Sequence, residues 1–231
     1  MSTLTPTPRT TLKRRPARGS YERATIHAIL DEALVCHVAF ALDAQPVVTP
    51  MAYARVGDKL YLHGSAANRT LRALDNGVEA CVNVTLLDGL VLSRSALHHS
   101  VNFRSVTVFG TARKVTDAVE KLEALRAIVE HAVPGRWPDV RKPSAKELQL
   151  PLVLSIPLDE ASAKLRKGGP VEEEADYALP VWAGEIPLRL VPAAPVDDVR
   201  LAAGVNPPAY ASAYQRPTAK GERPWNPPSE S

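Results

Sequence analysis

The sequence carries a series of β-favouring runs whose connections are mostly too short for parallel pairing. Each run is rich in apolar and β-branched residues, and turn residues such as Asp, Asn, Gly and Pro separate most of them. Parallel neighbours need a crossover of about a dozen residues or more. The sequence therefore predicts an antiparallel barrel rather than a doubly wound sheet. The predicted strands span 34–42, 46–55, 60–63, 78–87, 90–95, 106–115, 152–156 and 161–166.

Helices are predicted at the periphery, where apolar residues recur at helical spacing behind a capping residue. Residues 21–32, 67–74 and 117–131 follow this pattern, and a very short helix follows a capping-box sequence near residue 144. The predicted N-terminal caps are Ser20, Ser65, Asp117 and Ser144. The fold class expected from these elements is mainly β with peripheral helices.

The two ends of the chain differ in composition from its middle. The first twenty residues hold five basic and no acidic side chains together with three prolines, and residues 205–231 hold six prolines. Such segments bury too little apolar surface to fold by themselves. The sequence predicts a disordered basic leader over residues 1–19, a folded domain over 20–204 and a disordered Pro-rich tail over 205–231.

Charge and composition exclude several classes of protein. Residues 21–204 hold 20 basic and 23 acidic side chains, so the folded part lacks the basic excess of a nucleic-acid-binding domain. No run of about 18 apolar residues predicts a membrane span, and the basic leader lacks the apolar region of a secretory signal. The only cysteines are Cys36 and Cys81, which argues against a disulfide scaffold and favours a cytoplasmic protein.

The segment 61–74 is the most informative for chemistry. A predicted strand ends at His63, Gly64 and Ser65 follow, and a helix begins with Asn68 and Arg69 in its first turn. Basic residues are disfavoured there because the helix dipole is positive at that end. An anion at the helix start, held by free N–H groups, the serine hydroxyl and the guanidinium, explains the exception. The alternative is a surface arginine paired with Asp75 or Asp58.

A second candidate is the pair His98 and His99, in a polar stretch between two predicted strands. Three interpretations stay open: a loop facing a substrate, a metal or haem site completed by His63, and ordinary surface polarity. Adjacent side chains point in different directions, and no Cys or carboxylate spacing typical of a metal site lies nearby. The sequence therefore predicts no metal site.

Four short blocks, in this order and at this spacing, resemble a known family. The blocks are residues 46–53, 63–74, 103–110 and 179–188. Over roughly residues 20–190 the chain resembles the pyridoxamine 5′-phosphate oxidase-like, FMN-binding split barrels, and most closely the branch with the nitroimidazole-resistance flavoproteins. The resemblance implies a six-stranded antiparallel split barrel that forms a homodimer with FMN at the subunit interface.

The resemblance also implies site residues. Arg69 falls at the position of the basic residue that holds the FMN phosphate, and Asn68 precedes it where the oxidases have an arginine. Ser105 falls where the oxidases place a glutamine near the flavin ring. Trp182 resembles a late aromatic that reaches the flavin from the partner subunit; an ordinary core tryptophan is the alternative. The positions expected to line the isoalloxazine are Val48, Thr49, Pro50 and Met51.

The function expected from the resemblance is an FMN-dependent oxidoreductase that passes electrons from a reduced nicotinamide to a small oxidised substrate. The residues themselves can supply a phosphate clamp at Arg69, a flat apolar slot at residues 48–51, and donors to the flavin from His63, Ser105 or backbone N–H groups. His98 and His99 are candidates for contact with the acceptor. The alternatives are a non-catalytic flavin carrier or sensor, and a barrel that binds haem or deazaflavin.

Overall fold

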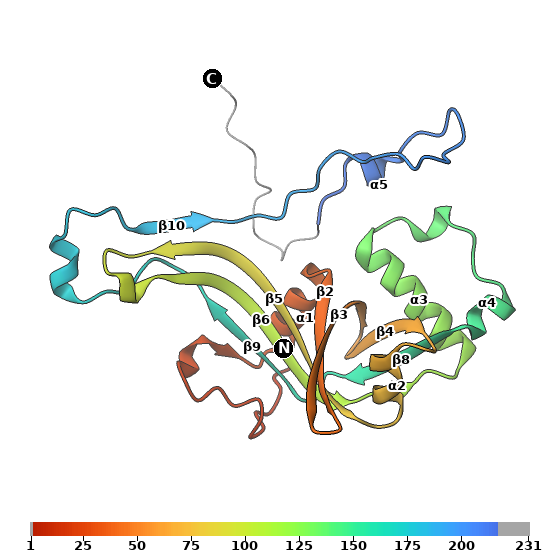
Figure 1. The fold of residues 1–231 in the computed structure, drawn as a ribbon, viewed down its shortest axis with the longest axis horizontal. Helices are drawn as coiled ribbons and strands as arrows, with labels where there is room; N and C mark the ends of the chain where they lie inside the picture. Colours follow the sequence, from red (N-terminus) through yellow and green to blue (C-terminus); the bar gives the residue numbers. More distant parts are fainter. Residues whose placement is uncertain (1, 217–231) are drawn as a thin grey trace.

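A computed structural model describes residues 2–216 and consists of one antiparallel sheet with helices around it (Figure 1). The sheet has ten strands in the order β1-β9-β6-β5-β2-β3-β4-β8-β7, and β10 pairs with β5. The strands are β1 (Gly19–Ser20), β2 (Val35–Leu42), β3 (Gln45–Val56), β4 (Lys59–Ser65), β5 (Glu79–Leu92), β6 (Ser100–Thr111), β7 (Arg113–Lys114), β8 (Pro151–Pro157), β9 (Ala161–Arg166) and β10 (Gly184–Pro187). The α-helices are α1 (Arg23–Glu32), α2 (Arg69–Asp75), α3 (Ala118–Ala132), α4 (Ala145–Gln149) and α5 (Ala209–Ser212).

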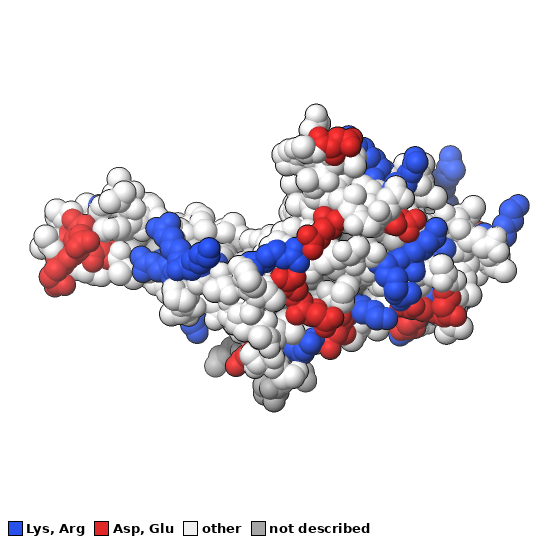
Figure 2. Space-filling model, turned by 90° about the horizontal axis from the view of Figure 1, so that it is seen from below, with Lys and Arg blue, Asp and Glu red and all other residues white. Residues whose placement is uncertain are grey.

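The molecule has a broad part and a narrow part. The long β5–β6 hairpin, accompanied by β10, projects from the broad part, where α1, α2, α3 and α4 lie (Figure 1). Lys and Arg mix with Asp and Glu over the broad part, whereas basic and acidic side chains form separate groups on the narrow part (Figure 2). No helix within residues 2–216 is long and apolar enough to cross a membrane.

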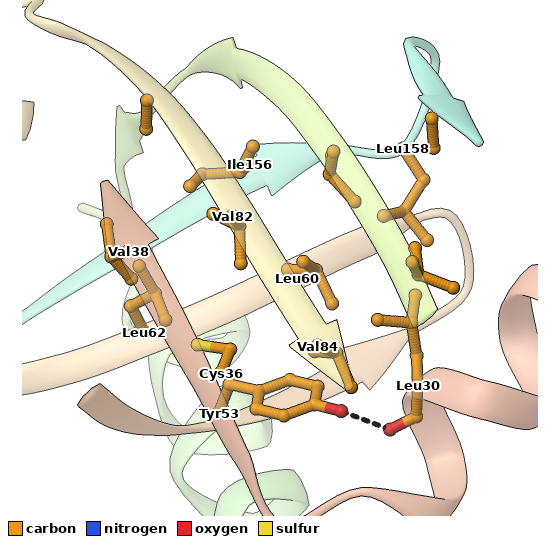
Figure 3. Packing of buried hydrophobic residues seen from close by; sticks show 14 of the residues in the cluster. Leu30, Cys36, Val38, Tyr53, Leu60, Leu62, Val82, Val84, Ile156 and Leu158 are labelled. Atoms are coloured by element: carbon orange, nitrogen blue, oxygen red, sulfur yellow. Dashed lines mark hydrogen bonds between the residues drawn. The ribbon is translucent and has the colours of Figure 1, made fainter. Parts of the chain in front are cut away.

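The hydrophobic core lies on the inner face of the curved sheet. On β2, the side chains of Cys36, Val38 and Phe40 are buried at every second position, as expected for a strand with one face turned inward. They pack with apolar side chains from neighbouring strands and from α1 (Figure 3). The Tyr53 hydroxyl donates a hydrogen bond to the Leu30 carbonyl oxygen, which ties β3 to α1 and satisfies the one polar atom of a buried ring.

The antiparallel, mainly β fold predicted from the sequence is confirmed, but the strand count is ten where the resemblance implied six. Three of the extra strands, β1, β7 and β10, are only two to four residues long. The predicted turn at residues 88–89 is wrong, because β5 continues through it to Leu92. The register with β6 shifts between Leu87 and Gly89, so this sequence forms a bulge within one strand.

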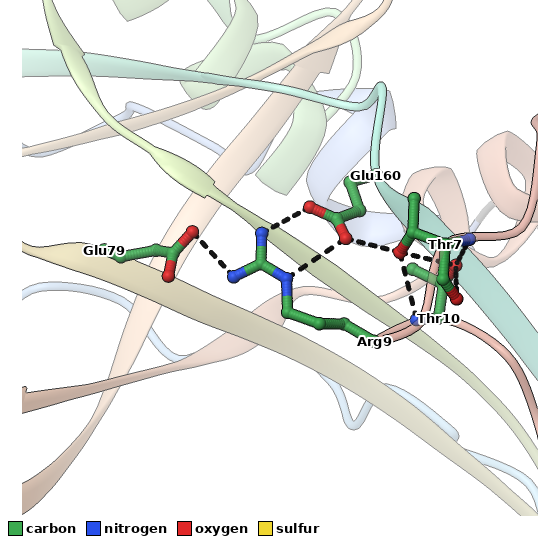
Figure 4. A network of polar contacts seen from close by, with 5 residues as sticks. All are labelled: Thr7, Arg9, Thr10, Glu79 and Glu160. Atoms are coloured by element: carbon green, nitrogen blue, oxygen red, sulfur yellow. Dashed lines mark hydrogen bonds and ion pairs between the residues drawn. The ribbon is translucent and has the colours of Figure 1, made fainter.

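Residues 2–19, which the sequence predicted to be a disordered leader, make contacts with the sheet in the structure. Leu4 is buried at 6% exposure and belongs to the core. Arg9 forms ion pairs with Glu79, at 2.6 Å, and with Glu160, and the Thr7 hydroxyl donates to Glu160 as well (Figure 4). These contacts come from residues at least 70 positions away in the chain, which is why composition alone could not predict them.

The described part of the predicted Pro-rich tail is also placed against the folded domain. The Tyr214 hydroxyl donates to the carbonyl oxygen of Ala132 at the end of α3, 2.8 Å away. The Arg216 guanidinium donates to the carbonyl oxygens of Asp31 and Ala33, each at 2.9 Å. The structure thus gives Tyr214 and Arg216, which fall in the predicted tail, contacts with α3 and α1, and residues 217–231 lie outside the described part of the chain.

Candidate functional site

The first part of the candidate site is the corner where β4 leads into α2. The Oδ1 atom of Asn68 accepts a hydrogen bond from the Leu71 N–H at 3.0 Å, so Asn68 caps the helix. The predicted cap, Ser65, instead accepts from the Ala67 N–H at 3.2 Å and closes the turn before it. The helix thus begins at Arg69, two residues later than predicted, and Arg69 occupies its first position.

Arg69 is free to meet an anion at this corner. Its side chain is exposed, and no ion pair or hydrogen bond to it occurs within residues 2–216. Both carboxylates that offered an alternative explanation are engaged elsewhere. Asp75 lies 3.5 Å from the Lys114 ammonium, and Asp58 lies 2.7 Å from the Arg23 guanidinium. The structure therefore favours the interpretation of Arg69 as an anion-binding residue over that of a surface ion pair.

Strand β3 brings the predicted flavin-lining residues to the same corner. The hydroxyls of Thr49 on β3 and Thr70 on α2 are joined by a 2.9 Å hydrogen bond. Val48, at 61% exposure, and Pro50 lie on the exposed face of the strand, and Met51 is half-buried against the core. Thr70 follows Arg69 in the chain, so the Thr49–Thr70 contact brings the start of α2 to β3, while Val48 and Pro50 lie on the other face of that strand.

His63 and Gly64 come from β4 beneath the corner. The Nδ1 atom of His63 is buried and has no hydrogen-bond partner among the described residues. Burial lowers the pKa of this imidazole below its ordinary value, because the charged form would lose its solvation. A Cβ atom on Gly64 would lie 2.9 Å from Leu71 Cδ1, so a larger residue there would displace the Leu71 side chain where α2 packs on β4.

Three other predicted site residues lie away from this corner in the same chain. His98 and His99 are at the turn between β5 and β6, at the far end of the projecting hairpin from α2 (Figure 1). The Nδ1 atom of His99 lies 3.0 Å from the Ser93 hydroxyl. The Ser105 hydroxyl, on β6, donates to the Lys164 carbonyl oxygen at 3.4 Å. One chain therefore does not bring Ser105, His98 or His99 to Arg69.

Trp182 precedes β10 on the outside of the molecule. Its side chain is 64% exposed, which excludes the alternative of a core tryptophan. Its ring covers the backbone of Gly184, where a Cβ atom would approach the indole to 3.0 Å.

The structure also contains two hollows that were not predicted from the sequence. One, of about 570 Å³, lies beside Arg104, whose guanidinium bridges Glu32 and Asp88 at 2.6–2.9 Å. The other, of about 520 Å³, is lined by His98, His99 and basic residues of the N-terminal segment. The run of basic residues near the N-terminus is the sequence feature that corresponds to the second hollow. It was interpreted as part of a disordered leader and not as part of a binding site.

Comparison with known proteins decides the family. The family model described as pyridoxamine 5′-phosphate oxidase matches residues 22–165. The chain belongs to this family. The resemblance seen in the sequence is thereby confirmed. The matched residues include both β3 and the β4–α2 corner. No curated protein matches the chain.

Solved structures of two relatives match almost the whole chain. The flavocytochrome Anf3 from Azotobacter vinelandii is 40% identical, with a TM-score of 0.85, over 92% of this chain and 99% of that protein. The FAD and haem binding protein from Mycobacterium smegmatis is 36% identical, with a TM-score of 0.81, over 85% and 96%. A 5-nitroimidazole antibiotic resistance protein from Bacteroides thetaiotaomicron, described as putative, is 24% identical over 63% and 85%, with a TM-score of 0.54, and shares the fold.

Proposed function

We propose that the protein binds a flavin nucleotide at the β3–β4–α2 corner and uses it to transfer electrons. The observation that carries the proposal is the unpaired Arg69 at the first position of α2, next to Thr70, whose hydroxyl bonds Thr49 on β3. Membership of the oxidase family supports it, as do two relatives described as a flavocytochrome and as an FAD and haem binding protein.

Each residue at the corner has a part in this proposal. The planar guanidinium of Arg69 can hold two oxygens of a phosphate at once, and the Asn68 cap fixes where the helix begins. Val48 and Pro50 offer an apolar surface to the ring. His63, kept neutral by burial, can donate or accept one hydrogen bond at neutral pH. When bound, a flavin supplies transfer of one or two electrons.

The proposal also concerns which flavin nucleotide is bound, FMN or FAD. The resemblance implied FMN, whereas one relative is described with FAD. Both molecules carry the riboflavin phosphate that Arg69 would hold. The visible spectrum of the purified protein tests the proposal, and chromatography of the released cofactor distinguishes FMN from FAD. A protein without flavin absorbance that takes up neither added FMN nor added FAD contradicts it.

We further propose that a reduced nicotinamide supplies the electrons and a small oxidised molecule accepts them. Bleaching of the bound flavin by NADPH without oxygen, followed by reoxidation with an added acceptor, is the expected result. Bound flavin that no nicotinamide reduces favours the alternative of a non-catalytic carrier or sensor.

Haem binding is a second candidate, favoured by the descriptions of the two relatives and by the buried, unpartnered Nδ1 atom of His63. A neutral imidazole nitrogen is a common ligand of haem iron. Cells supplied with a haem precursor are expected to yield protein with a Soret band that is lost in His63→Ala. A Soret band that persists in this variant assigns the ligand to another residue.

We also propose that the protein is a homodimer in which Trp182 crosses to the partner. Apolar side chains are exposed around β10, including Val181, Leu190 and Val191, and such surfaces commonly mark protein contacts. Trp182→Ala is expected to shift the monomer–dimer equilibrium toward monomer by about tenfold or more, the effect of a central aromatic anchor. Sedimentation velocity measures this shift, with the equally exposed Leu150→Ala on the other side of the fold as control. Equal dimer content in both variants contradicts this role.

A further inference from the structure

The hollow of about 520 Å³ on the projecting part is formed by three segments that are distant in the sequence. The N-terminal segment contributes Arg14, Arg15 and Arg18, and β9 contributes Lys164 and Arg166. The N-terminal segment is held there because β1 pairs with β9, with Gly19 opposite Lys164. The turn between β5 and β6 closes the third side. Its size is in the range of small-molecule binding sites.

The side chains that line this hollow carry charges of one sign. No carboxylate lines it, and none of the five basic side chains forms an ion pair within residues 2–216. Arginines elsewhere do pair, as Arg9 does with Glu79 and Arg141 with Glu147. Like charges that converge without counter-charges repel one another, so this arrangement lowers stability until an anion occupies it.

Arg166 is the most constrained of the five. It is only 7% exposed, and its guanidinium donates to the Asn102 side-chain oxygen and to the carbonyl oxygens of Gly168, at 2.7 Å, and Gly169, at 3.1 Å. Glu185 reaches Asn102 rather than Arg166. Burial, together with the charge of Arg18 nearby, lowers the pKa of the Arg166 guanidinium, although the charge of Glu185 acts in the opposite direction. The protein thus fixes a charge in place without a carboxylate in direct contact.

The other residues that line the hollow form one polar side and one apolar side. The Nδ1 atom of His98 is buried there without a partner among the described residues, although buried nitrogens are normally hydrogen-bonded. Leu97 and Phe103 line the hollow as well. A ligand that fits has several negative charges close together and an apolar or aromatic part attached.

We propose that this hollow binds the diphosphate group of a dinucleotide, with its nucleoside against Leu97 and Phe103. Two phosphates in sequence match a cluster of five cations better than one carboxylate or one phosphate does. Two dinucleotides carry this group in flavin redox chemistry. One is a reduced nicotinamide dinucleotide, and the other is FAD bound between two copies, because the hollow and the Arg69 corner of one chain lie at opposite ends of the hairpin. The site itself does not depend on the proposed flavin corner, because its cations and its ligand group are defined without it.

Calorimetric titration of the full chain with ADP and with AMP tests the proposal, before and after removal of any flavin that copurifies. ADP is expected to bind, and to bind more tightly than AMP. The variant Arg18→Gln/Lys164→Gln is expected to weaken ADP binding by about tenfold or more, since each substitution removes a charged hydrogen bond. The control Lys146→Gln/Arg200→Gln removes the same charge from exposed residues outside the hollow and is expected to leave binding unchanged.

Competition between ADP and each dinucleotide identifies which dinucleotide supplies the diphosphate group. ADP binding that is blocked by bound FAD assigns the group to FAD, and ADP binding that persists with FAD bound but is displaced by NADPH assigns it to the nicotinamide. Both results support the proposal. It is overturned if ADP binds neither preparation, if AMP binds as tightly as ADP, or if both double variants weaken binding equally. Flavin absorbance is read separately, so failure here is distinct from failure of the flavin corner.

Discussion

Replacing Arg69 with alanine is expected to weaken flavin binding by about 1.5–3 kcal/mol, the range for hydrogen bonds to charged groups. The reason is that Arg69 has no other partner within residues 2–216, so its removal costs the folded protein little and falls on the ligand phosphate. Fluorescence titration of flavin-free protein with FMN and with FAD measures the loss. Riboflavin, which lacks the phosphate, is expected to bind the variant and the unsubstituted protein equally.

The control for this experiment is Lys146→Ala, which removes an exposed charge from another short helix, α4. It is expected to leave both affinities unchanged. Unchanged affinity for FMN in a folded Arg69→Ala protein assigns the phosphate to another place and contradicts the proposed corner. Equal losses for FMN and riboflavin also contradict it, because the effect then does not involve the phosphate.

The largest expected effect on stability is that of Arg104→Met, about 3 kcal/mol of unfolding free energy. The Arg104 guanidinium bridges Glu32 at the end of α1 and Asp88 at the bulge of β5, with distances of 2.6–2.9 Å. All three side chains are at most one quarter exposed. Removing one member of a buried ion pair costs about 3–5 kcal/mol, and this partial exposure places the cost at the lower end. Chemical denaturation measures the change.

Arg126→Met is the matched comparison for Arg104. Arg126 pairs with Glu123 on the exposed surface of α3, where such a pair contributes about 0.5 kcal/mol or less. The two substitutions remove the same charge and introduce the same side chain. A cost for Arg104→Met as small as that for Arg126→Met shows that the bridge between α1 and β5 does not stabilise the fold.

The parts of the fold that depend on local pattern could be predicted from the sequence. The strands predicted at 34–42 and 46–55 match β2 and β3 to within one residue at each end, because alternation and the turn between them are local signals. The break predicted at Asp88 and Gly89 is wrong for a long-range reason. Arg104 binds Asp88, and β10 passes so close that a Cβ atom on Gly89 would lie 3.0 Å from the Ile186 oxygen. The glycine there makes room for a strand instead of a turn.

The candidate site could be predicted only in part, because some of its features depend on contacts between residues that are distant in the sequence. The segment that contains Asn68 and Arg69 could be found because a basic residue at a helix start is a local exception. The choice between Asn68 and Ser65 as the cap depends on side-chain geometry that spacing does not give. The basic hollow could not be predicted, because it forms only where three segments that are distant in the sequence come together. Arg14, Arg15 and Arg18 therefore looked like a solvated leader until the pairing of β1 with β9 placed them.

The two terminal strands of the sheet affect how separate molecules of this protein can associate. The path begins at β1 and ends at β7, each two residues long, and β7 consists of Arg113 and Lys114. A long free edge offers its backbone to a neighbouring molecule as a template for fibril growth, whereas a very short, cationic one offers almost none. Edge-to-edge pairing with sheets of separate molecules is therefore disfavoured at these two ends of the path.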